Sequence, residues 1–173
     1  MPQAKRILKI EIKRMDDPDP DTSYMGTFDR LPQSDFAINP ETCKEDFGRF
    51  EWFNPQTVEP FNANAKWISV GTIDKEAFWR KTMHENARKD YERMKAFDRG
   101  DFGYIGIRAE AEIVIDSVIQ RISSGGLWGI ESDSDESYLK EVEHEELSSL
   151  RGILHEMGFS KRAIASAAKA SEL

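Results

Sequence analysis

The amino-acid sequence predicts an α+β fold. In this prediction an antiparallel sheet, formed by an N-terminal strand and a C-terminal β-hairpin or meander, has two amphipathic helices packed on one face. Apolar and polar side chains alternate over residues 105–115, and apolar side chains recur at helical spacing between residues 79 and 94. A glycine-rich stretch at residues 124–129 leads into an acidic helical segment. The 173 residues fit one domain, which we expect to span residues 1–173.

The N-terminal strand is predicted from alternation over residues 7–13, which is typical of a strand with one buried face. Its inward side chains are expected to be Leu8, Ile10 and Ile12. We expect a short strand at residues 23–28 to return along it as a loose hairpin, and another brief strand at residues 67–70. Residues 31–64 contain four prolines and scattered aromatic side chains without a regular period, so we expect an irregular segment packed on the body.

The longest strand is predicted at residues 105–115, because its strict alternation gives one apolar and one wet face. Asp116–Ser117 is expected to form a tight turn, from which residues 118–122 return as a second strand. Two glycines at residues 125–126 favour a further turn or a bulge, and a short strand is expected at residues 127–130.

Two long helices are predicted from apolar stripes at helical spacing. The first begins at Thr72 or Asp74 and continues to about Phe97, and Gly100 ends it. Its buried stripe is expected to contain Trp79, Met83, Ala87, Tyr91 and Met94.

The second helix is acidic and follows the glycine-rich stretch. Asp133, with Glu136 three residues later, fits a capping box, and the helix is expected to end near Met157. Its inward side chains are expected to be Leu139, Val142, Leu150, Ile153 and Met157. Residues 160–173 are expected to form a short C-terminal helix or tail.

The charge balance limits the kinds of partner. A net charge of -8 and a pI of about 5.0 argue against general affinity for nucleic acid or for an anionic membrane. The same balance suits a protein that presents carboxylates to a basic partner. Cys43 is the one cysteine, so no intramolecular disulfide can form, and a reducing interior is expected. No apolar run has the length of a signal core or a membrane span, so we expect a cytoplasmic protein.

Motifs for catalysis, metals and nucleotides all fail on spacing. Each of the three histidines precedes a glutamate, but none has the second histidine four residues later that a zinc site requires. Glu131, Asp133 and Asp135 occupy alternate positions of a calcium loop, but Glu136 replaces its glycine and Val142 its final glutamate. The glycine-rich stretch lacks the lysine of a phosphate-binding loop. We therefore assign no catalytic, cofactor-binding or metal-binding residue.

Three sequence strings resemble those of a known protein family. They are DPDTSYMG at residues 19–26, GIRAEAEI at residues 106–113 and ISSGGLWGIESDSD at residues 122–135. Together they resemble a family of uncharacterised small proteins encoded by bacteriophages and bacterial mobile elements, over the first thirty residues and about residues 87–158. The resemblance implies an accessory gene product in the cytoplasm of a bacterial host, and it assigns no functional residue.

The first functional hypothesis is a non-enzymatic binding protein that inhibits a host complex. The expected partner is a host protein or ribonucleoprotein complex with a basic surface, without direct nucleic-acid or membrane binding. In this setting the inhibitor would act against a host defence, as an anti-CRISPR or antirestriction protein. The expected contact residues are Trp128, Glu131, Asp133, Asp135, Glu136, Glu141, Glu143, Glu145 and Glu146.

The second hypothesis is a small enzyme or ligand-binding protein. It uses the wet face of the longest predicted strand, where Arg108, Glu110 and Glu112 would lie near Trp128. Convergence of these groups in a pocket, with perturbed pKa values, would favour it.

Overall fold

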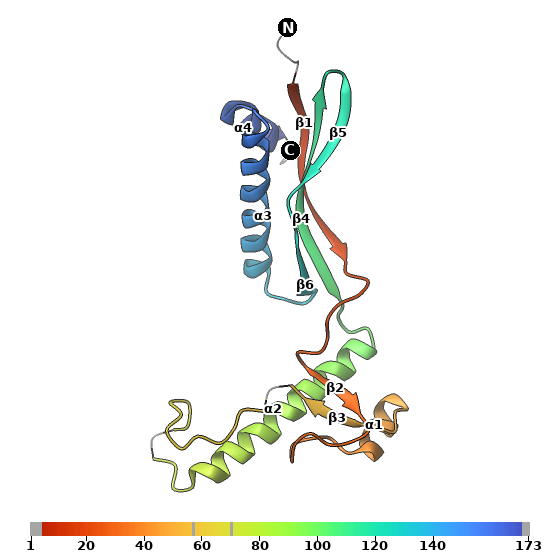
Figure 1. The fold of residues 1–173 in the computed structure, drawn as a ribbon, viewed down its shortest axis with the longest axis vertical. Helices are drawn as coiled ribbons and strands as arrows, with labels where there is room; N and C mark the ends of the chain where they lie inside the picture. Colours follow the sequence, from red (N-terminus) through yellow and green to blue (C-terminus); the bar gives the residue numbers. More distant parts are fainter. Residues whose placement is uncertain (1–4, 57, 70, 171–173) are drawn as a thin grey trace. The chain divides into compact units, whose positions relative to one another are not determined.

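The computed structural model describes residues 5–56, 58–69 and 71–170, and the chain divides into two compact units (Figure 1). Unit 1 combines Met1–Pro20 with Phe102–Leu173, and unit 2 is Asp21–Asp101. The α+β class with antiparallel sheets is confirmed. The expectation of a single domain stays a prediction, and each unit is described by itself.

The sheet of unit 1 is organised around one long central strand. Its strands are β1 (Lys5–Asp16), β4 (Tyr104–Ile115), β5 (Val118–Ser123) and β6 (Leu127–Glu131). Strand β1 pairs antiparallel with one side of β4, and β5 and β6 pair antiparallel with successive parts of its other side. The predicted C-terminal β-hairpin, β4–β5, is therefore confirmed, but it does not extend into a meander, because β5 and β6 run in the same direction along the same side of β4. The glycines between β5 and β6 interrupt the strand that runs along this side of β4, but the chain continues in the same direction after them.

A bulge in β1 changes which of its side chains face inward. The register shifts between Ile7 and Lys9, so Leu8 leaves the alternation. Leu8 is 41% exposed, whereas Ile10 is buried and Ile7 packs against the main core. The expectation that Leu8 faces inward is therefore wrong, because one extra residue re-aims its side chain.

Asp116 and Ser117 form the predicted two-residue turn of the β4–β5 hairpin. Ile115 pairs with Val118, and the two turn residues have positive φ angles of 50° and 69°. This is the backbone of a type I′ turn, for which Asn-Gly is preferred because a side chain opposes the left-handed conformation.

We expect Ser117→Gly to raise the free energy of unfolding by about 1 kcal/mol, because glycine adopts this conformation without the steric penalty. Urea unfolding followed by circular dichroism measures the change. Ser123→Gly, at the last residue of strand β5 where the chain is still paired with Glu110, is the matched control and should lower stability instead. A loss of stability in Ser117→Gly would contradict the role assigned to the turn.

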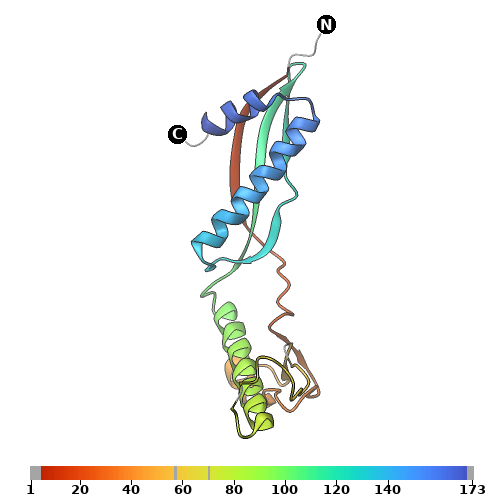
Figure 2. The same cartoon turned by 90° about the vertical axis from the view of Figure 1, so that its left-hand side faces the viewer.

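Helices α3 (Glu136–Glu156) and α4 (Lys161–Ala170) cover one face of the unit 1 sheet (Figures 1 and 2). The predicted C-terminal helix is therefore present. Leu150 and Leu154 of α3 pack with Ala109 and Ile113 of β4 in the main core. Leu154, rather than the predicted Ile153, is fully buried.

The N-cap of α3 is Asp135, which accepts a hydrogen bond from the Ser137 backbone at 2.8 Å. The predicted cap, Asp133, lies in the preceding turn, so that prediction is wrong. The reason is that the chain leaves β6 at Glu131 and closes a turn, in which Ser134 N–H donates to Glu131, before it can enter the helix.

Unit 2 contains β2 (Gly26–Asp29), α1 (Pro40–Phe47), β3 (Trp52–Pro55) and α2 (Lys75–Asp98). Helix α2 is the predicted first helix, with the predicted buried stripe and Asp74 as its N-cap. Strand β2 pairs with β3 and not with β1, so the expected N-terminal hairpin is wrong. Residues 67–69 form the end of a turn and irregular chain rather than a strand, and Val70 lies outside the described residues.

Aromatic side chains hold unit 2 together. Phe28 contacts Phe47 and Phe53, and both of these contact Tyr91 of α2, with ring centroids 5.2–5.5 Å apart. The segment 31–64 supplies two of these rings, which explains how a largely irregular stretch is fixed to α2. Its regular parts are α1 and β3.

Candidate functional site

Trp128 lies flat against the sheet face that α3 and α4 leave uncovered within unit 1. Ile105 pairs with Ile130 and Ile107 with Leu127, so Trp128 and Gly129 together face Gly106 as a bulge. A Cβ atom on Gly106 would lie 2.5 Å and 2.6 Å from Cδ2 and Cζ3 of the indole. Because Gly106 has no side chain, the indole ring can lie directly on the backbone at this position, which is its seat on the sheet. The Trp128 side chain remains 44% exposed.

Two carboxylates fix the backbone on either side of Trp128. The Gly129 N–H donates to Asp17 Oδ2 at 3.1 Å, and the Gly126 N–H donates to Glu146 Oε2 at 3.0 Å. Asp17 follows β1 and Glu146 belongs to α3, so the strand that carries Trp128 is held from both sides. Glu146, an expected partner contact, therefore has a structural role.

Arg14 joins the end of β1 to the first two turns of α3. Its guanidinium binds both oxygens of Glu136, at 2.9 Å and 3.3 Å, and its Nε donates to Glu143 Oε1 at 2.7 Å. Hydrogen bonding to Arg14 lowers the pKa of Glu136. Because a bidentate guanidinium pair is strongly directional, Glu136 and Glu143 are oriented toward the sheet and are partly neutralised.

The remaining predicted contact residues lie along the β6–α3 segment. Glu131 ends β6, Asp133 is exposed in the turn, and Asp135 caps the helix. Hydrogen bonding to Ser137 lowers the pKa of Asp135. Glu141 and Glu145 are exposed on α3. The nine residues thus separate into side chains that hold the fold and side chains that are presented to solvent.

The wet face of β4 is a ladder of ion pairs. Glu110 is buried between Lys13, at 2.7 Å, and Arg108, whose Nε donates to it at 2.8 Å. The hydrogen bond from Lys13 is the main cause of a lowered pKa at Glu110, and the hydrogen bond from Arg108 lowers this pKa further. A general acid at neutral pH requires the opposite shift. Arg121 Nε lies 4.0 Å from Glu112 Oε2, and a cavity of about 150 Å³ on this face is lined by residues that include Glu110, Glu112 and Arg121.

We expect Glu110→Gln to weaken the acid sensitivity of the fold. Because the folded-state pKa of Glu110 is lowered, its ionised form stabilises the fold above its ordinary pKa of 4.5, and this contribution disappears as pH falls through the lowered value. The wild-type protein should therefore lose more stability between about pH 5 and pH 3 than Glu110→Gln does. Urea midpoints across this range measure the difference. Glu141→Gln is the control, and superimposable profiles for wild type and Glu110→Gln would refute the assignment.

Other chemistry is limited among the described residues. No group of three histidine, cysteine, aspartate or glutamate side chains there is placed to hold a metal ion. Cys43 is fully buried, and burial raises the pKa of its thiol, which disfavours the nucleophilic thiolate. Within the same residues, every helix is too short or too polar to cross a bilayer.

Comparisons with protein-family models, curated proteins and solved structures found no match to the chain.

The sequence indicated Trp128 but not its seat at Gly106, the Asp17 contact or the Arg14 pairs. A glycine in the interior of the longest predicted strand was the available signal, because such a residue often marks the close approach of another group.

Proposed function

We propose that this chain is a non-enzymatic binding protein that docks on a basic surface of a host protein or ribonucleoprotein complex and inhibits it. The observation that carries the proposal is the indole of Trp128, which is held open to solvent on the sheet face opposite α3 and lies three residues before Glu131, the first acidic residue of the β6–α3 segment. Residues 131–146 contain eight acidic residues and one lysine, Lys140. The proposed setting is a bacteriophage or mobile element, with anti-CRISPR or antirestriction inhibition as the specific activity.

The physical basis is the combination of an aromatic anchor with negative charge. Tryptophan is among the residues that contribute most to binding energy, and its face attracts arginine and lysine cations. Surrounding carboxylates speed the approach of a basic partner and make association sensitive to salt. The bulge and the carboxylate contacts from Asp17 and Glu146 hold this strand in place before binding, which reduces the entropy lost on docking.

The enzyme alternative has less support. Glu110 has two cationic partners and a lowered pKa, so the sheet face resembles a structural ion-pair ladder more than an acid–base pair.

The test is a pull-down from bacterial lysate with the tagged full-length chain, at low and at high salt. We expect a specific host complex at low salt, with recovery reduced at high salt and at least tenfold by Trp128→Ala. Glu141→Lys with Glu145→Lys tests whether the partner also contacts the outer face of α3, on the other side of the sheet. Glu143 and Glu146 are unsuitable for charge reversal, because they bind Arg14 and Gly126.

The matched control is Glu45→Lys with Asp98→Lys, an equal change of charge at exposed positions of unit 2. Recovery that all of these variants leave unchanged would refute the proposed surface. Equal loss in the control would show that net charge, and not this surface, controls binding.

A further inference from the structure

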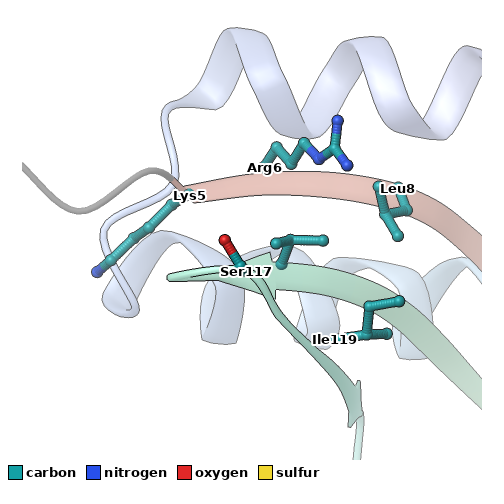
Figure 3. Close-up of a pocket in the computed structure, with 6 residues that line it drawn as sticks. Lys5, Arg6, Leu8, Ser117 and Ile119 are labelled. Carbon is teal, nitrogen blue, oxygen red and sulfur yellow. The ribbon is translucent and has the colours of Figure 1, made fainter.

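A second site lies at the other end of the unit 1 sheet, beside the β4–β5 turn. A cavity of about 570 Å³ opens beside the start of β1 and the paired β4–β5 hairpin (Figure 3). It is lined by Lys5, Arg6, Leu8, Val114, Ser117 and Ile119. Its volume falls within the range of small-molecule pockets.

The floor of this cavity is aliphatic because of the β1 bulge. The bulge turns Leu8 out of the core, and Ile119 pairs with Val114 in register, so the three side chains gather at one place. Figure 3 shows Leu8 and Ile119 on opposite strands beside the cavity. Leu8 is 41% and Ile119 62% exposed, so apolar surface is left open that the core does not use.

Positive charge borders this apolar floor. Arg6 lies opposite Val114 in the β1–β4 register, and among the described residues no carboxylate or carbonyl pairs with its guanidinium. Lys5 lies at the same end and donates to the Met157 carbonyl at 3.0 Å. In Figure 3 the Arg6 side chain extends along β1 toward Leu8, whereas Lys5 points away from it. One cation is therefore available to a ligand.

We infer that this cavity binds a small aliphatic carboxylate. Its chain would cover Leu8, Val114 and Ile119, and its carboxylate would pair with the Arg6 guanidinium, whose planar donors match a carboxylate. The charge of the rim selects an anion, and the apolar floor selects an acyl chain. The site is independent of the proposed partner surface at Trp128.

The test uses decanoate, at a concentration at which it remains monomeric, with the full-length protein. We expect saturable binding of one molecule by calorimetry, with methyl NMR shifts concentrated at Leu8, Val114 and Ile119. Arg6→Gln should weaken binding about tenfold, the loss expected for one charged hydrogen-bonded pair. Arg121→Gln, on the same sheet face but outside the cavity lining, should leave it unchanged.

Decyltrimethylammonium has an alkyl chain of similar length with the opposite charge, so it distinguishes recognition of the carboxylate from general adsorption of an apolar chain. It should not shift the three methyl-bearing residues at the concentration where decanoate saturates them. Equal binding of this cation, unchanged affinity in Arg6→Gln, or shifts centred elsewhere would overturn the inference. So would binding to anionic vesicles without binding to monomeric decanoate, because that would indicate a lipid surface instead.

Discussion

We expect Gly106→Ala to lower the free energy of unfolding by about 1–3 kcal/mol, the usual range for forcing extra volume into a packed site. Alanine normally stabilises a strand relative to glycine, so the direction of the effect is diagnostic. The reason for the reversal is that a Cβ atom would enter the indole of Trp128, at 2.5 Å from Cδ2. Urea unfolding measures the loss, and a red shift of tryptophan fluorescence should accompany it.

A double-mutant cycle shows whether Trp128 is the cause. In the Trp128→Ala background the same Gly106→Ala change should be neutral or stabilising, because the ring that opposes it is gone. The coupling free energy should therefore be at least about 1 kcal/mol, which is larger than the deviation from additivity that independent sites show. Additive effects would mean that Trp128 does not rest on Gly106, and the proposed anchor would lose its structural basis.

Phe53→Ala should have the largest effect on stability, a loss of about 3–5 kcal/mol. The Phe53 side chain is fully buried at 0% exposure, and its ring contacts Phe28 and Tyr91. It also lies within 2.6 Å of the Cβ position of Gly26, so the strand pair is built around it. Removing the ring leaves a cavity that the surrounding aromatic side chains can fill only in part.

Phe50→Ala is the matched control for this prediction. It removes the same side chain from a position that is 71% exposed, where its ring contacts Lys44. Its effect should stay within about 0.5 kcal/mol. Equal losses in the two variants, measured by urea unfolding, would contradict the aromatic core assigned to unit 2.

The sequence predicted the parts of the fold that depend on a regular period. Residues 105–115 alternate because one face of β4 is covered by helices and the other is not, and the stripe of α2 follows from the same physics at helical spacing. Helix α1 was missed although its signals were present. Asn39 caps it, Pro40 opens it and Gly48 ends it with a φ of 69°.

The features that make the site could not be read from one-dimensional patterns. The Leu8 bulge adds one residue without a local signal, and the pairing of β2 with β3 depends on packing against α2. Arg14 meets Glu136 and Glu143 only once the register of β1 and the position of α3 are known. Trp128 was found because glycines surround it, but its seat on Gly106 requires the β4–β6 register.

The most direct test of the proposed function is an NMR titration with a short oligo-arginine peptide. The resonance of the Trp128 indole N–H is assigned by its loss in Trp128→Phe, and the other three tryptophans serve as internal references. At low salt we expect the Trp128 signal to shift and saturate, more strongly than with oligo-lysine because a guanidinium stacks on indole, and to return as salt is added. A Trp128 signal that stays in place while resonances elsewhere shift would contradict the proposal.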